Sequence, residues 1–198
     1  MLKILGKRSS INVRKVLWTC DEVGLTYQQE DYGSGFQPVD SAEFRALNPN
    51  GLVPVLLDDD FVLWESNSIC RYLTRKAGRE DLLPVTPQGA ADIERWMDWQ
   101  ATEFNNAWRY AFMGLVRKDP RFQDPTAIKE SVAAWTRCVQ IVNTQLQQTG
   151  AWIAGREFTL ADIVLGLSVH RWKMTPFAHP EMAEVERWLA PNLGYDAD

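Results

Sequence analysis

The spacing of apolar residues in the first part of the chain predicts short strands that alternate with short helices. Apolar side chains recur every three or four residues between Asn12 and Val23, as on one face of an amphipathic helix, and Gly24 closes that segment. The runs 54–57 and 61–64 are short, apolar and separated by an acidic turn, which favours paired strands. The full set of expected elements is strands at 3–6, 26–31, 54–57 and 61–64 and helices at 12–23, 41–47 and 67–76.

The pattern changes between residues 78 and 89, where charged residues, two prolines and glycine interrupt the periodic segments. Every apolar stretch beyond this point has helical spacing. The order strand–helix–strand–helix–strand–strand–helix before it is typical of a thioredoxin-like domain. We therefore expect an α+β protein with a thioredoxin-like domain at 1–79 and an all-α domain at 88–198, in which helices cover 90–116, 126–148, a segment after Thr159, and 180–189.

A Thr-x-x-Asp sequence precedes the most apolar of these helices. In such a capping box the side chains of Thr159 and Asp162 satisfy exposed backbone N–H groups at the start of the helix. Because the run that follows, 163–167, is apolar throughout, we expect a buried helix and assign both residues to stability.

Composition narrows the possible functions. The 198 residues carry a formal net charge of −5 without a long basic run, which argues against nucleic acid as a partner. No segment is long and apolar enough to predict a membrane span, and the first residues do not have the pattern of a secretory signal, so we expect a cytoplasmic protein. The three cysteines are far apart and lack neighbouring ligands, which predicts neither disulfides nor a metal site.

The most informative segment is Asn-Pro-Asn-Gly-Leu-Val-Pro at 48–54, followed by Glu65-Ser66. Proline at the start of a strand donates no ladder hydrogen bond. We predict a cis Val53–Pro54 bond, which would turn the backbone of Val53 outward, where an extended peptide could pair with it. Glu65 and Ser66 fall where a strand gives way to a helix, whose N-terminus attracts carboxylates. Taken singly, each piece favours a plain structural explanation, because Val-Pro is common in loops and Ser66 fits a helix N-cap.

In this order and at this spacing, the two motifs resemble the glutathione-binding half of the glutathione S-transferase family. The resemblance implies that Val53 pairs with the cysteinyl backbone of glutathione and that Glu65 and Ser66 hold its γ-glutamyl amino and carboxylate groups. It also implies that Gln37 contacts the glycyl end. The sequence departs from the family at Leu52, where relatives often have Gln or Lys.

A second motif, Ser9-Ser10-Ile11-Asn12-Val13-Arg14-Lys15, follows the first expected strand. The pattern Ser-x-Asn-x-x-Lys resembles the serine-type transferases of the family, in which the serine donates a hydrogen bond to the glutathione thiolate. A hydroxyl donor at a helix N-terminus lowers a thiol pKa, so we select Ser10. Asn12 and Ser9 stay open as alternatives for this role, and Ser9 is also expected to contact glutathione. The alternative for Ser10 is a simple N-cap.

The second substrate is expected against the long helix of the C-terminal half, at Trp108, Arg109 and Phe112. Aromatic residues at this spacing are often core residues, but a guanidinium among them should reach solvent or an anion, which suggests an electrophile with a carboxylate. The tail 191–198 lacks the Arg-Pro-containing final helix common in relatives.

The resemblance implies a homodimeric enzyme that attacks a small hydrophobic or carboxylate-bearing electrophile with glutathione, its co-substrate, without a metal. Two other readings stay open. One is reductive chemistry, either glutathione-dependent dehalogenation or disulfide reduction. The other is a protein that binds glutathione or hydrophobic ligands without turnover.

Overall fold

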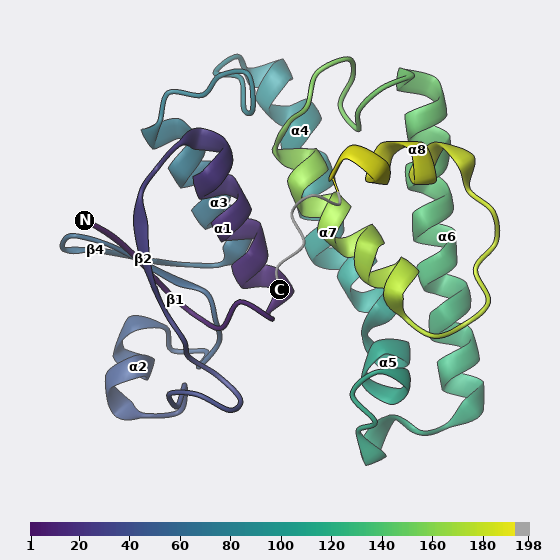
Figure 1. Cartoon of the computed structure of the whole chain (residues 1–198), viewed down its shortest axis with the longest axis horizontal. Helices are drawn as coiled ribbons and strands as arrows, with labels where there is room; N and C mark the ends of the chain where they lie inside the picture. Colours follow the sequence, from purple (N-terminus) through teal and green to yellow (C-terminus); the bar gives the residue numbers. More distant parts are fainter. Residues whose placement is uncertain (193–198) are drawn as a thin grey trace. The chain divides into compact units, whose positions relative to one another are not determined.

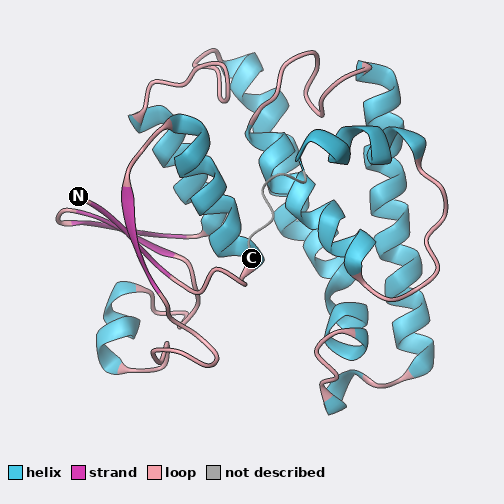
Figure 2. Cartoon of the chain, in the orientation of Figure 1, coloured by secondary structure: helices cyan, strands magenta, loops and turns pink. Residues whose placement is uncertain are grey.

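The computed structural model describes residues 1–192 and divides the chain into two compact units, one up to Thr86 and the other from Pro87 onward. The first unit is a mixed sheet with helices, and the second is helical (Figures 1 and 2). This arrangement confirms the expected α+β class. The first unit contains β1 (Leu2–Leu5), α1 (Ile11–Val23), β2 (Tyr27–Glu30), α2 (Ala42–Leu47), β3 (Val55–Asp58), β4 (Phe61–Trp64) and α3 (Ser66–Lys76).

The sheet of the first unit has the strand order β2-β1-β3-β4. The strand β1 is parallel to β2 and antiparallel to β3, and β4 is antiparallel to β3, so β1 and β4 run in the same direction. The helices α1 and α3 pack on each other beside the sheet, whereas α2 lies apart from them (Figure 1). The helices that follow β1 and β4 therefore both start at the same end of the sheet, where β1 and β4 end and β3 begins. We call this end, at Leu5, Val55 and Trp64, the edge of the sheet.

Side chains along each strand alternate between the two faces of the sheet, so each face of this unit has its own small core. Leu5 of β1 pairs with Val55 of the neighbouring β3, and both cluster with Phe44 of α2. Their neighbours Ile4 and Leu56 are also paired and fully buried, and they point to the opposite face because successive strand residues alternate.

The second unit contains α4 (Pro87–Trp99), a π-helical turn (Gln100–Phe104), α5 (Asn105–Leu115), a 3-10 turn (Pro120–Phe122), α6 (Pro125–Thr149), α7 (Leu160–Met174) and α8 (Ala183–Asn192). The single helix expected at 90–116 is thus interrupted by the π turn. A π turn adds one residue to the helix without breaking its apolar pattern. Residues 100–104 contain no proline or glycine, so the sequence gives no sign of this turn. Gln100, in this turn, is 1% exposed and donates to the Oγ of Ser168 at 2.9 Å.

The expected capping box at the start of α7 is confirmed. The Oδ2 of Asp162 accepts hydrogen bonds from the Thr159 N–H at 2.9 Å and the Thr159 hydroxyl at 3.0 Å. Its Oδ1 accepts from the Ile153 N–H and from the Trp188 indole, both at 2.9 Å. The carboxylate therefore fastens the preceding loop and α8 to α7.

The last helix is Ala183–Asn192, whereas the sequence predicted 180–189. Just before the expected start, the ring centroid of His179 lies 4.4 Å from that of Trp172. Most of the unusual tail, 193–198, lies outside the described residues. Within residues 1–192, no helix combines the length and apolar character that crossing a membrane requires.

Candidate functional site

Strand register brings three sequence motifs to one edge of the sheet. Leu5, the last residue of β1, pairs with Val55 at the start of β3, and Val55 pairs with Trp64 at the end of β4. Since neighbouring strands are about 4.8 Å apart, the three positions span about 10 Å. The segments that adjoin these residues, 6–10, 53–54 and 65–66, therefore lie within reach of one small peptide.

Gly6 allows this close approach. Its φ is +148°, and a Cβ at this position would come within 2.5 Å of Val13 Cγ2 and 3.0 Å of Val53 Cβ. A larger residue would push the exit of β1 away from the first turn of α1 and from Val53. The glycine thus holds the Ser10 segment next to the Val53 segment.

The Val53–Pro54 peptide bond is cis, which confirms the sequence prediction. The loop before it is shaped by Asn48, which is 3% exposed: its Nδ2 donates to the Leu52 carbonyl at 2.8 Å, and its Oδ1 accepts from the Asn50 N–H at 3.1 Å. Within residues 1–192, the backbone of Val53 takes no part in the strand ladders or in the turn hydrogen bonds, so it is available to an extended ligand. The Leu52 side chain is 63% exposed.

Glu65 has a φ of +73°, a conformation that costs a non-glycine residue about 1–3 kcal/mol and is often found at ligand sites. It occupies the N-cap position of α3, so the N-cap reading of Ser66 is wrong: Ser66 is the first helical residue. The Glu65 side chain makes no capping hydrogen bond, and Ser66 is 7% exposed. The first-turn N–H groups of α3 are suited to a carboxylate.

Ser10 is the N-cap residue of α1 by position, but its side chain makes no capping hydrogen bond. Its backbone is held by the Lys7 carbonyl at 3.0 Å, and its own carbonyl accepts from the Arg14 N–H at 2.9 Å. Asn12 lies in the first turn of α1 and is partly exposed, as is Ser10, whereas Ser9 is exposed in the preceding turn. The hydroxyl of Ser10 is therefore not committed to the helix.

Gln37 lies in the loop after β2, which ends at the same sheet edge because Glu30 pairs with Leu5. The loop closes on itself: the Gly33 N–H donates to the Gln37 carbonyl at 2.9 Å. The Lys7 ammonium fastens it to the Ser10 segment through the Ser34 carbonyl at 3.0 Å. The Gln37 side chain is exposed.

The cysteines lack the character of nucleophiles. Burial raises the pKa of Cys20 to about 12 and that of Cys70 to about 11, and it also raises the pKa of Cys138. All three are free thiols that stay protonated at neutral pH, so a thiolate at this site has to come from a ligand. Among residues 1–192, histidines, cysteines and acidic residues form no group of three that could hold a metal ion.

In the second unit, Trp108 and Phe112 lie one turn apart on α5 with their ring centroids 5.3 Å apart. The guanidinium on these rings belongs to Arg171 of α7, 4.7 Å from the Trp108 centroid and 4.3 Å from that of Phe112. Arg109 is exposed, because adjacent helical residues point about 100° apart. The structure therefore brings Trp108 and Phe112 together with Arg171, a residue that the sequence did not indicate, and leaves Arg109 exposed on the same helix.

The edge of the sheet offers an unpaired backbone segment, a helix N-terminus and a hydroxyl at a second helix N-terminus. This combination defines a thioredoxin-like protein suited to an extended peptide with a carboxylate and a reactive group. Its second unit adds a helical body with an aromatic and cationic face.

Comparisons with known proteins agree with this class. Residues 1–75 match the family described as Glutathione S-transferase, N-terminal domain. The chain is 36% identical to the glutathione S-transferase GstB of Escherichia coli over 95% of its own length and 91% of the relative's. It is 35% identical to the glutathione-bound theta class glutathione S-transferase of Xanthomonas axonopodis pv. citri, with a TM-score of 0.90 over 97% of this chain and 92% of that one. The chain belongs to the glutathione S-transferase family, and it is a transferase.

Proposed function

We propose that the protein conjugates glutathione to small electrophiles. The thiolate sulfur attacks an electrophilic carbon, a carbon–sulfur bond forms, and the leaving group departs with its electron pair. The observation that carries this proposal is the convergence of the segments at 6–10, 53–54 and 65–66 on one sheet edge. That edge presents the groups that a tripeptide with a thiol and a γ-glutamyl carboxylate requires.

In this proposal the backbone of Val53, turned toward the ligand before Pro54, pairs with the cysteinyl residue of glutathione. Glu65 and Ser66 bind the γ-glutamyl amino and carboxylate groups, helped by the N-terminus of α3. The glycyl end and the edges of the ligand are contacted by Gln37, Leu52 and Ser9.

Ser10 would donate its hydroxyl to the thiolate, with Asn12 beside it. The uncommitted hydroxyl and the positive end of α1 both favour the anion over the thiol. Each unit by which the thiol pKa falls requires about 1.4 kcal/mol of such preference. No protein nucleophile is needed, in keeping with the protonated state of the cysteines.

The electrophile would rest its apolar part on Trp108 and Phe112, and a carboxylate on it would be paired by Arg171. A guanidinium stacked on aromatic rings donates hydrogen bonds in its own plane, so it can engage rings and an anion together. This support favours Arg171 over Arg109 for anion recognition.

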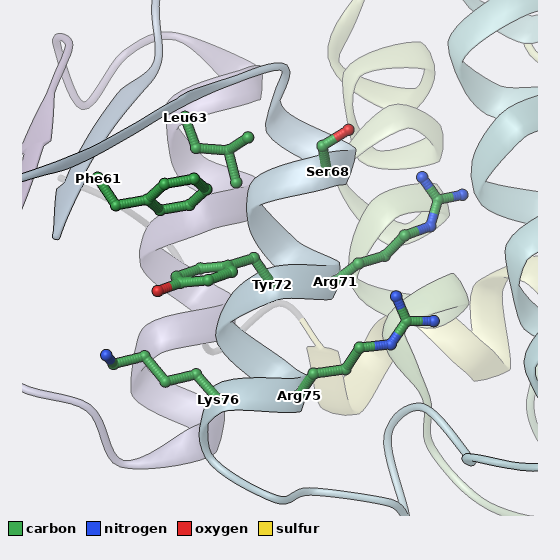
Figure 3. Close-up of a pocket in the computed structure, with 7 residues that line it drawn as sticks. All are labelled: Phe61, Leu63, Ser68, Arg71, Tyr72, Arg75 and Lys76. Atoms are coloured by element: carbon green, nitrogen blue, oxygen red, sulfur yellow. The ribbon is translucent and has the colours of Figure 1, made fainter.

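A homodimer is also part of the proposal, and the surface of β4 and α3 supports it. Phe61, Val62 and Trp64 are 47%, 37% and 37% exposed, so this outermost strand presents large apolar side chains on both of its faces. Beside them lies a hollow of about 570 Å³. In it the ring centroids of Phe61 and Tyr72 lie 5.1 Å apart, and Arg71 and Arg75 extend from α3 in the same direction (Figure 3). In a two-fold dimer the same surface of a second copy would cover these apolar side chains. The lining of the hollow is Phe61, Leu63, Ser68, Arg71, Tyr72, Arg75 and Lys76.

We place this activity in the cytoplasm and in detoxification of electrophiles. Three free thiols suit a reducing compartment. In this proposal the domain at 1–79 binds glutathione, and the domain at 88–198 binds the electrophile.

Reductive chemistry is the second candidate. Because the protein thiols stay protonated, a bound glutathione would supply the thiolate for dehalogenation or disulfide reduction. The test is retention on immobilised glutathione followed by assay with a neutral aryl halide, a haloacid and a mixed disulfide. Thioether formation supports conjugation, and turnover of the disulfide alone supports reduction. Retention without any turnover would instead favour a non-catalytic binding protein.

A further inference from the structure

Lys15 is 2% exposed, although lysine is almost never fully buried without a partner. It lies in the second turn of α1, and its ammonium donates to the side-chain oxygen of Asn67 at 3.3 Å. Asn67 is itself 7% exposed and is the second residue of α3. The bond thus joins the early turns of two helices whose residues are 52 positions apart in sequence.

These two helices carry different parts of the proposed glutathione site. The N-cap residue of α1 is Ser10, and Asn67 directly follows Ser66. Both helices start at one edge of the sheet and pack against each other. The Lys15–Asn67 bond therefore links the segment that holds the thiolate donor to the segment that holds the γ-glutamyl contact.

Stability alone does not explain a cation at this place. Taking an ammonium out of water costs several kcal/mol, and replacing buried ionic groups by apolar residues of similar shape is often neutral or stabilising. The charge acts within the helix interface, since it lowers the pKa of Cys70 against the larger, opposite effect of burial. The Thr19 hydroxyl, by contrast, donates to the Lys15 carbonyl at 2.8 Å further along the same helix.

We propose that Lys15 is a positioning residue for the transferase reaction: through Asn67, it fixes the start of α1, with Ser10 and Asn12, against Ser66 at the start of α3. The inference rests on the proposed glutathione site. It assigns to Lys15 no contact with the substrate.

The test compares Lys15→Met and Asn67→Leu, which remove the donor and the acceptor at similar volume, with the double variant. Steady-state kinetics are measured for glutathione and for a neutral aryl halide. We expect kcat/KM for glutathione to fall about 10- to 100-fold in each single variant, the effect of a shift of about 1 Å, while KM for the aryl halide is unchanged. Both single substitutions remove the same Lys15–Asn67 hydrogen bond. The kcat/KM of the double variant for glutathione should therefore lie within about twofold of that of the single variants.

Two further variants separate positioning from general destabilisation. Asn67→Asp keeps an oxygen acceptor for Lys15 and should retain near wild-type kcat/KM for glutathione, a result that can be obtained even if Lys15→Met fails to fold. Thr19→Val removes a buried hydroxyl from the same helix and should lower stability to urea without changing either KM. Additive losses in the double variant, or a loss in Asn67→Asp as large as in Asn67→Leu, would overturn the positioning role. Failure of the wild-type protein to bind glutathione would instead refute the proposed function.

Discussion

The guanidinium carbon of Arg171 lies 4.3 Å from the ring centroid of Phe112, which joins α7 to α5 by a cation–π contact. The ring of Trp108 lies 4.7 Å from the same carbon. This arrangement places a permanent positive charge beside the two aromatic residues proposed to bind the electrophile. Recognition of an anionic electrophile can therefore be tested by comparing substitutions of Arg171 and Arg109.

We predict that Arg171→Met raises KM for haloacids and leaves turnover of neutral aryl halides nearly intact. The expected loss in kcat/KM for the anionic substrate is about 1.5–3 kcal/mol, the size of a charge-assisted hydrogen bond. Arg109→Met, one residue from Trp108 but exposed, tests the residue that the sequence favoured. If only Arg109→Met lowers kcat/KM for the anionic substrate, Arg109 and not Arg171 recognises the anion. If Arg171→Met lowers kcat/KM equally for anionic and neutral substrates, Arg171 has a structural role.

Substitutions at the start of α3 test the γ-glutamyl contact. Ser66→Ala and Glu65→Ala should each weaken glutathione binding by about 1–3 kcal/mol, because each leaves a charged ligand group without a partner. Calorimetry measures the affinity directly. Ser68→Ala, in the same helix and in the lining of the hollow, is the matched control and should bind as the wild type does. Unchanged affinity in both site variants would move the glutathione site elsewhere.

The exposed face of β4 predicts an effect on assembly. Phe61→Glu places a charge where an apolar contact with a second copy is proposed, so the dimer should dissociate at protein concentrations that keep the wild type assembled. Sedimentation equilibrium reports the change in mass. Val85→Glu is the control, since Val85 is 71% exposed and lies outside this surface. A wild-type protein that sediments as a monomer would contradict the homodimer.

Asp162 predicts a pH dependence of stability. Burial raises the pKa of this carboxyl from 3.8 to about 6, despite the hydrogen bonds that favour the anion. Because the folded pKa is above the unfolded one, the folded state binds more protons between these values, and stability is lost as the pH rises from about 4 to about 6. Asp162→Asn cannot titrate, so the stability of the wild type relative to this variant should fall by about 2–3 kcal/mol across that window. Urea unfolding of both proteins at pH 4 and pH 7 measures their free energies of unfolding. If the wild type becomes more stable relative to Asp162→Asn as the pH rises, the prediction is wrong.

Elements defined by local chemistry could be predicted from the sequence. Strand alternation, helical spacing and the position of Gly24 located α1 and the strands to within a few residues, because each depends on side chains close in sequence. The cis bond before Pro54 and the Thr159–Asp162 capping box were predicted for the same reason and are confirmed. The convergence of the site motifs follows from strand order, which the family resemblance implied.

Features that depend on distant partners could not be predicted in this way. The π turn at 100–104 keeps an apolar pattern, so only its hydrogen bonds reveal it. Arg171 is 63 positions from Trp108, and nothing in its own helix indicates an aromatic partner. Lys15 was part of a motif, but its burial and its bond to Asn67 arise only when α1 packs on α3. Long-range packing decides these cases.

The most direct test of the central claim is the ionisation of bound glutathione, measured by the ultraviolet absorbance of the thiolate across a pH titration. In the wild-type complex the thiol pKa should lie at least about one unit below that of free glutathione, which corresponds to about 1.4 kcal/mol of preferential stabilisation. Ser10→Ala should return the pKa toward the free value while glutathione stays bound through Val53, Glu65 and Ser66. An unshifted thiol pKa in the wild-type complex, or the same depressed value in wild type and Ser10→Ala, would contradict thiolate stabilisation by Ser10 at this sheet edge.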